Sequence, residues 1–183
     1  MSNKPQQDRV IGKWLIRAAI VLAFVVVLVI GVGMLLPATF QSSAMIAVTD
    51  VTPQQFWALI SDPQRCHLSS DPSCVVIPLP DVDGMPAWQE QIRGALIDVR
   101  VIEQTPGQRI VWDLADRSGP LSTRWTLTVQ TTATGSTMVS IEEAGAVASG
   151  SWDTGVYRFL MFAVGGWGPE DYLKRLQVAA SSR

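Results

Sequence analysis

The sequence predicts an α+β protein in which one transmembrane helix precedes a domain built from an antiparallel sheet and a C-terminal helix. Three observations predict it: an apolar run near the amino terminus, a series of segments that alternate apolar and polar residues, and a change to helical periodicity after Gly150. We expect a cytoplasmic tail at residues 1–17, a transmembrane helix at 18–37 and a single domain at 40–183.

The apolar run from Ala18 to Leu36 contains 19 residues and no charged side chain. As a helix it spans roughly 28 Å, close to the thickness of the hydrocarbon core of a bilayer. Its 13 Val, Ile, Leu and Phe residues make insertion favourable by on the order of 4–8 kcal/mol. A cleaved signal peptide is the alternative, because Ser42 and Ala44 offer a small-x-small site, but its apolar part is normally shorter. A buried helix of a soluble protein would normally carry a polar face, so we expect an uncleaved anchor.

The charges around the run predict its orientation. Four basic residues and one acidic residue precede it, and the first charge after it is Asp50. Basic residues stay on the cytoplasmic side, so we expect the amino terminus inside the cell and the domain outside it, in the periplasm of a Gram-negative cell. The residues after the run include ten basic and fifteen acidic side chains without a basic cluster, which argues against a nucleic-acid partner.

Two cysteines, Cys66 and Cys74, lie in a polar stretch rich in Ser and Pro. Outside the cytoplasm they could form a disulfide that constrains the unfolded chain by roughly 2.6 kcal/mol, and two reduced thiols are the equally weighted alternative. With the only histidine, His67, they offer too few ligands for a metal site. We expect no metal or cofactor, and we expect His67 to be a solvated loop residue.

Alternating residues between the apolar run and Gly150 predict strands. The strands are expected at residues 41–48, 74–79, 87–93, 95–104, 109–115, 122–131 and 137–146. A short amphipathic helix should begin at Thr52-Pro53, with Thr52 as its N-cap. Such alternation is typical of an antiparallel sheet with one buried and one solvated face.

Helical periodicity replaces the alternation after Gly150. An apolar stripe is formed by Trp152, Val156, Phe159, Leu160, Ala163 and Val164. Residues 165–168 interrupt it, and Pro169 suits the first position of a second helical segment that carries Tyr172. We expect the apolar stripe to be buried against the dry face of the sheet.

Four stretches together resemble the SRPBCC superfamily (START-like or Bet v 1-like), and within it the bacterial polyketide cyclase/dehydrase-like proteins. The stretches are 51–63 (VTPQQFWALISDP), 106–112 (PGQRIVW), 135–145 (GSTMVSIEEAG) and 172–176 (YLKRL). The resemblance covers roughly residues 40–180 and implies a helix-grip fold, in which a curved sheet wraps a long C-terminal helix around an apolar cavity. The glycine-rich interruption departs from the continuous helix that this family implies.

Candidate cavity residues follow from the alternation. In their strands, Glu90 and Glu143 point to the same side as large apolar neighbours and are therefore expected to face the interior. A carboxylate in an apolar cavity suits ligand orientation or proton transfer. Trp112 and Trp125 could stack on a flat ligand from the sheet side. On the helix side the candidates are Phe159 and Phe162. The alternatives are carboxylates at the solvated rim and aromatic residues that only pack in the core.

Three functions remain open from the sequence. The first is a membrane-anchored domain that binds an apolar, lipid-like small molecule between sheet and helix. The second is a polyketide cyclase- or dehydratase-like enzyme that uses general acid–base catalysis, which rests on the resemblance. The third is a non-catalytic interaction domain whose cavity is filled by its own side chains. The sequence names no catalytic residue and leaves open whether the protein is an enzyme.

Overall fold

The computed structural model describes residues 4–69, 71–117, 119–148, 153–160 and 168–181. The described residues divide into two compact units. One contains residues 4–37 with 153–160, and the other contains 38–148 with 168–181. Residues 153–160, which the sequence assigned to the domain, are therefore grouped with the amino-terminal helix.

The first unit is built on helix α1, Lys4–Leu35. Within the described part of the chain, one helical stretch, Trp14–Leu35, is long and apolar enough to cross a membrane. Helix α1 begins well before the apolar run, so the predicted tail is helical from Lys4. Helix α3, Asp153–Leu160, packs against α1.

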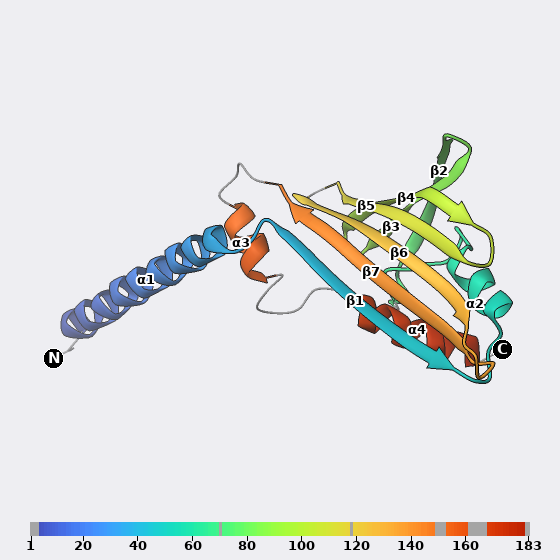
Figure 1. Ribbon diagram of the computed structural model, residues 1–183. Coiled ribbons are helices and arrows are strands. Elements are labelled where there is room, and N and C mark those ends of the chain that lie inside the picture. The colour runs from blue at the N-terminus through green and yellow to red at the C-terminus, as the bar shows by residue number, and fades with distance from the viewer. Residues whose placement is uncertain (1–3, 70, 118, 149–152, 161–167, 182–183) are drawn as a thin grey trace. The chain divides into compact units, whose positions relative to one another are not determined.

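The second unit is organised by a seven-stranded antiparallel sheet in the order β1-β7-β6-β5-β4-β3-β2 (Figure 1). The strands are β1 Thr39–Val48, β2 Val75–Val82, β3 Met85–Ile92, β4 Ala95–Thr105, β5 Arg109–Asp116, β6 Leu121–Thr131 and β7 Thr137–Val147. Every strand that the alternation predicted is present. The first and last strands of the chain, β1 and β7, pair along their whole length.

Local sequence signals explain several boundaries. Helix α2, Pro53–Ile60, begins with a complete capping box in which Thr52 and Gln55 exchange hydrogen bonds. The tight turn between β3 and β4 places Arg93 and Gly94 at φ values of 50° and 90°. Two successive positive φ values are what a two-residue hairpin needs, and glycine supplies one without strain.

Helix α4, Pro169–Ser181, covers one face of the sheet and contacts β1, β7 and α2 (Figure 1). Its buried Leu173 and Leu176 belong to the same apolar core as Trp125 and Ile141 of the sheet. The helix-grip arrangement predicted from the sequence is confirmed. The gripping helix is α4, which has 13 residues and is shorter than the long helix that we expected.

The predicted apolar stripe after Gly150 has a different partner. Its members in α3, which include Phe159, lie in the helix that packs against α1. The expectation that this stripe covers the dry face of the sheet is therefore wrong for the residues of α3. Trp152, Ala163, Val164 and the candidate Phe162 lie outside the described residues.

Candidate functional site

Aromatic rings occupy the interior between the sheet and α4. Trp88, Trp112, Trp125 and Tyr172 are each at most 3% exposed. Trp112 lies edge-on to Trp88 at a centroid distance of 5.9 Å and stacks on Trp125 at 6.5 Å. The Tyr172 ring of α4 closes the group at 5.4 Å from Trp125. The two tryptophans predicted as cavity-lining residues are thus packed against each other and against the helix.

His67 lies inside this group, which corrects the prediction of a solvated loop residue. Its side chain is 2% exposed and its ring centre is 4.7 Å from that of Trp112. Nε2–H donates to the carbonyl of Asp62 at 2.8 Å, so Nδ1 is the acceptor for the Tyr172 hydroxyl at 3.2 Å. Burial lowers the pKa of His67 to about 4, so the imidazole is neutral at pH 7.

Glu90 on β3 is fully buried. Its carboxylate accepts hydrogen bonds from the backbone N–H groups of His67 and Leu68, both at 2.9 Å, and from the indole N–H of Trp88 at 3.1 Å. Burial raises its pKa, and the three hydrogen bonds oppose that rise. Glu90 therefore attaches the Cys66–Leu68 segment to the sheet, and these protein donors take up both of its oxygens.

A disulfide joins Cys66 to Cys74 with the Cα atoms 6.3 Å apart. The Cys66 sulfur lies 3.1 Å from a carboxylate oxygen of Glu90, a contact without a proton because the sulfur is oxidised. Both sulfurs and the carboxylate lie within 4.8 Å of one another. While the disulfide is intact, neither sulfur is the thiolate that a metal ion requires.

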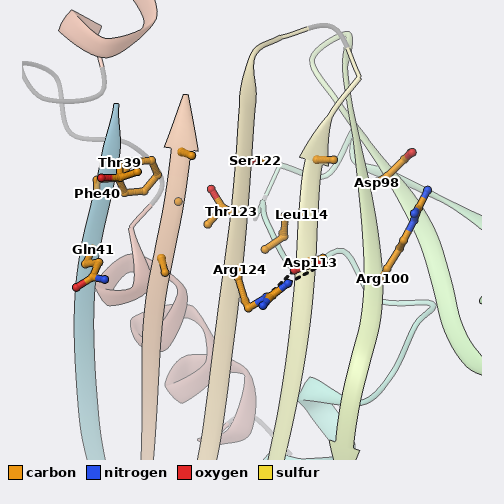
Figure 2. A pocket seen from close by; sticks show the side chains of 14 residues that line it. Thr39, Phe40, Gln41, Asp98, Arg100, Asp113, Leu114, Ser122, Thr123 and Arg124 are labelled. Atoms are coloured by element: carbon orange, nitrogen blue, oxygen red, sulfur yellow. Dashed lines mark hydrogen bonds and ion pairs between the residues drawn. The ribbon is translucent and has the colours of Figure 1, made fainter. Parts of the chain in front are cut away.

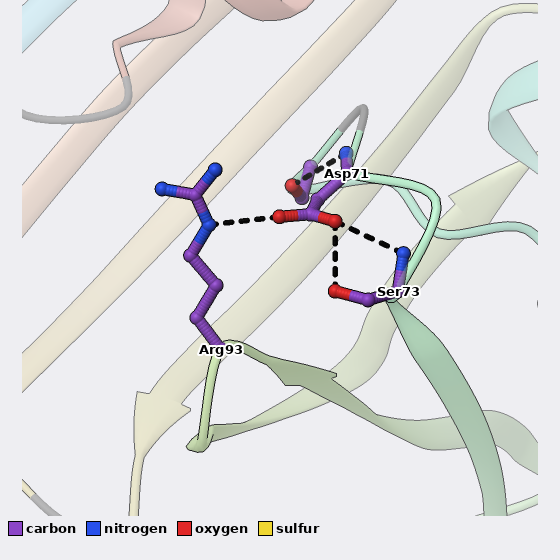
Figure 3. A network of polar contacts seen from close by, with 4 residues as sticks. Asp71, Ser73 and Arg93 are labelled. Carbon is purple, nitrogen blue, oxygen red and sulfur yellow. Dashed lines mark hydrogen bonds and ion pairs between the residues drawn. The ribbon is translucent and has the colours of Figure 1, made fainter.

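The loop that contains the disulfide is also attached to the β3–β4 turn, through Asp71 and Arg93 (Figure 3). Asp71 accepts hydrogen bonds from the backbone N–H and hydroxyl of Ser73 at 3.0 and 2.7 Å, and from Arg93 Nε at 2.8 Å. These bonds lower the pKa of Asp71 to about 2. The loop over β3 is thus fixed by a buried carboxylate, a disulfide and an exposed ion pair.

Glu143 on β7 has a more open environment than Glu90. It accepts a hydrogen bond from the indole of the cross-strand neighbour Trp125 at 2.9 Å, and one from the Ser42 hydroxyl at 2.6 Å. Its side chain remains partly exposed. The structure therefore does not bring the two predicted carboxylates together, and each binds a different tryptophan.

A groove of about 360 Å³ runs between α4 and the loop that carries His67. Its walls are formed largely by apolar surface from Tyr172, Leu176, Val178 and Ala179. Among its lining residues are three with cationic side chains: Arg65, Lys174 and Arg175.

The cations of the groove differ in their partners. Lys174 forms an ion pair with Glu170 at 3.2 Å. Arg175 is half-buried, donates to the carbonyl of Asp171 and lies 5.8 Å from the centre of the Tyr172 ring. Among the ion pairs of the described residues, none involves Arg65 or Arg175. The groove therefore combines apolar walls with two guanidinium groups, those of Arg65 and Arg175, for which the described residues provide no ion-pair partner.

A larger hollow, about 680 Å³, is more polar (Figure 2). Its charged lining includes Arg100, Asp113 and Arg124, which alternate along their strands with buried residues such as Trp112 and Trp125. Arg124 contacts both oxygens of Asp113, at 2.8 and 3.2 Å. Arg124 is thus exposed and paired. This hollow therefore suits an apolar ligand less well than the groove between α4 and the His67 loop, whose lining is more apolar.

Sequence reasoning missed three residues of the groove: His67, Tyr172 and Arg175. Tyr172 was predicted only as part of an apolar helix face, and His67 as solvated. One signal was available, because His67 directly follows a cysteine that can close its loop. The burial of that loop depends on Glu90, which is 23 positions away from His67, and no local pattern reports such a contact.

Comparison with known proteins relies on structure alone. No family model and no curated protein sequence matches the chain. Among solved structures, a hypothetical protein from Helicobacter pylori aligns with a TM-score of 0.56 and 14% identity, over 77% of this chain and 88% of its own. Ara h 8.0201 aligns with a TM-score of 0.54 and 8% identity, over 79% and 99%. The Zhui aromatase/cyclase from Streptomyces sp. R1128 aligns with a TM-score of 0.51 and 12% identity, over 79% and 86%.

The sheet order, the helix α4 on its inner face and these structural neighbours define a helix-grip domain. The chain therefore has the Bet v 1-like helix-grip fold that the sequence resemblance implied. At 8–14% identity to these neighbours, the likeness defines the fold and leaves the ligand and the chemistry to the site itself.

Proposed function

We propose that the protein is a membrane-anchored binding module for an amphipathic small molecule with an apolar body and an anionic head group. The observation that carries the proposal is the groove between α4 and the His67 loop, which pairs apolar walls with two guanidinium groups, those of Arg65 and Arg175. Apolar surface supplies affinity, and a few placed polar groups fix the orientation of a ligand.

The ligand would lie beside the filled interior. Rings that pack at centroid distances of 4.7–6.5 Å leave the groove, with Tyr172 and His67 in its lining, as the accessible apolar surface on this side. A carboxylate or phosphate head would meet Arg175, whose half-buried guanidinium interacts more strongly with an anion than a fully solvated one does.

The anchor supports this choice of ligand class. A helix with an apolar stretch at Trp14–Leu35 would keep the domain at a bilayer, where amphipathic molecules are concentrated. The basic residues before this stretch favour a cytoplasmic amino terminus and a domain on the opposite side. Three residues, 36–38, separate α1 from β1, so the tether is short.

Native mass spectrometry of the full-length protein in mild detergent tests the proposal, with oleate and oleyl alcohol as probes. We expect a one-to-one adduct with oleate and several-fold less with the alcohol. Val178→Trp should fill the groove and abolish the adduct, and Arg175→Gln should weaken it. Met45→Trp is the matched control, because Met45 and Val178 are similarly exposed at 70% and 72%. An adduct that is equal in all variants, or no adduct at all, would refute the proposal.

One observation favours a second candidate function, an enzyme that uses general acid–base catalysis. The Tyr172 hydroxyl and the His67 imidazole are hydrogen-bonded to each other, and both residues line the groove. Such a pair could move a proton to or from a bound substrate. The discriminating measurement is turnover of a β-polyketone substrate analogue: catalysis lost in Tyr172→Phe while oleate binding persists would favour the enzyme.

A further inference from the structure

Helix α3 has an unusual distribution of side chains. Its three buried residues are Thr154, Gly155 and Arg158, which are small or polar. Its apolar and aromatic residues are more exposed: Val156, Tyr157 and Phe159 are partly buried, and Leu160 is 49% exposed. A helix on the surface of a water-soluble domain normally buries its apolar side chains and exposes the polar ones. The reversed order in α3 indicates that its outer surface faces an apolar medium.

The position of α3 along α1 identifies that medium. A side chain at Gly33 would overlap the backbone of Gly155, and a Cβ at Gly155 would lie 2.6 Å from the carbonyl oxygen of Ile30. At 1.5 Å of rise per residue, Ile30 and Gly33 lie about 8 and 3 Å from the end of α1 at Leu35. Both positions fall inside the stretch that is apolar enough to cross a membrane.

The contact between the two helices is close and specific. Gly33 is the one buried residue in the part of α1 from Trp14 to Leu35, and small residues at such crossings let helices approach closely in lipid. Arg158, 7% exposed, donates from Nη1 to the carbonyl of Leu36 at 3.3 Å. A cation at this position satisfies an orphan carbonyl and complements the negative end of the helix dipole.

We propose that α3 is a second membrane element, an interfacial helix embedded in the lipid leaflet at the C-terminal end of α1, with its apolar face against acyl chains. A helix that packs against a spanning helix about 3–8 Å from the end of its apolar stretch shares the apolar surroundings of that stretch, and amphipathic helices bury about 5–10 Å into the boundary between head groups and acyl chains. The inference rests on the proposed anchor. It adds that the chain returns to the bilayer between β7 and α4, so the domain is attached to the membrane at two places.

Depth-dependent fluorescence quenching tests this inference on the full-length protein in phosphatidylcholine vesicles. Both cysteines of the chain are in the disulfide, so a single introduced cysteine can be labelled with an environment-sensitive fluorophore. Leu160→Cys reports on α3, Val27→Cys on the middle of α1 and Met45→Cys on the sheet; these side chains are 49%, 67% and 70% exposed. Tyr157→Cys replaces Leu160→Cys if the latter fails to fold.

We expect a nitroxide near the lipid head group to quench the label on α3 several-fold more than the label on the sheet, and aqueous iodide to do the opposite. If the α1 label is in lipid while the α3 label behaves like the sheet label, the inference is wrong and the anchor stands. If the α1 label also is in water, both the anchor and the inference are wrong.

A matched pair of glycine variants tests whether the crossing holds α3 in the leaflet. Gly33→Leu should reduce lipid quenching of the α3 label, because it forces the helices apart. Gly31→Leu should leave it unchanged, because no atom lies within 4 Å of a Cβ at Gly31. Equal quenching in the two variants would contradict a role for the crossing.

Discussion

Glu90 and Glu143 lie on the same face of the same sheet and each accepts a hydrogen bond from a tryptophan indole, yet their surroundings differ. Glu90 is fully buried beneath the Cys66–Leu68 segment and accepts two backbone N–H groups in addition to Trp88. Glu143 is partly exposed and accepts hydrogen bonds from the Trp125 indole and the Ser42 hydroxyl. A side chain that points to the inner face of the sheet is therefore not necessarily buried, because its burial depends on what covers that part of the strand.

The cover over Glu90 is a loop, and Glu90 itself holds that loop in place. A buried carboxylate is costly unless it is fully hydrogen-bonded, and here the loop supplies two of the three donors. Loop and carboxylate therefore stabilise each other. At Glu143 the remaining oxygen lone pairs can bind water. A glutamate at this position therefore contributes far less to the free energy of unfolding than Glu90 does.

The largest expected effect comes from Glu90→Ala. The variant leaves the N–H groups of His67 and Leu68 and the indole of Trp88 buried without an acceptor, so we expect a loss of about 3–5 kcal/mol in the free energy of unfolding. Denaturant titration of the full-length protein in detergent, followed by tryptophan fluorescence, measures it. Glu90→Gln keeps an acceptor oxygen and should cost clearly less; equal losses in the two variants would contradict the role assigned to the carboxylate.

The next effect is the pH dependence that comes from His67. Its pKa is about 4 in the folded protein and 6.5 in the unfolded chain, so the unfolded state binds more protons between these values. Its contribution to stability is complete above pH 6.5 and is lost as the pH falls toward 4, by up to about 3 kcal/mol. The raised pKa of Glu90 acts in the opposite direction at the lower end of this window.

Two measurements isolate the histidine. His67 is the only histidine of the chain, so its ring resonances can be followed without ambiguity, and they should not titrate between pH 7.5 and 5. Unfolding of Glu90→Gln as a function of pH removes the opposing carboxylate and should show the full loss. A ring that titrates near pH 6.5 would place His67 in solvent and contradict its burial.

The disulfide should contribute less than the buried groups that it encloses. Replacing both Cys66 and Cys74 by serine opens a loop whose ends are eight positions apart, and the loop-entropy model predicts a loss of about 2.6 kcal/mol in the free energy of unfolding. The free energy of unfolding should fall by that amount in the variant and on treatment of the native protein with a dithiol. The dithiol should leave the double variant unchanged, which is the control for effects outside the bridge.

The smallest effect is expected for Glu143→Ala. The variant removes two hydrogen bonds at a position that water reaches, so the loss should be about 1 kcal/mol or less. The same titration used for Glu90 measures it. An equal loss of unfolding free energy in Glu143→Ala and Glu90→Ala would contradict the conclusion that the loop over Glu90 makes that carboxylate the more important of the two.

Short-range signals explain how much of the fold could be predicted. The Thr52 cap with Gln55, the turn at Arg93-Gly94 and the alternation through Trp125 each depend on neighbours within a few positions, and all three features are present. The site could be predicted only in part. Glu90, Trp112 and Trp125 face inward as their parity requires, but the burial of His67 and the contacts of Tyr172 join distant segments.

The sequence by itself determined the strands, the capped helix α2, the apolar stretch of α1 and the helix-grip class, because periodicity and turn chemistry are encoded within each segment. Only the tertiary structure decided which surface each apolar segment covers: α4 covers the sheet, and α3 packs against α1 through Gly33 and Gly155. The tertiary structure also decided the burial of the His67 loop. The physical reason is that apolar burial is non-directional, so an amphipathic pattern specifies that a face is buried but not which partner buries it.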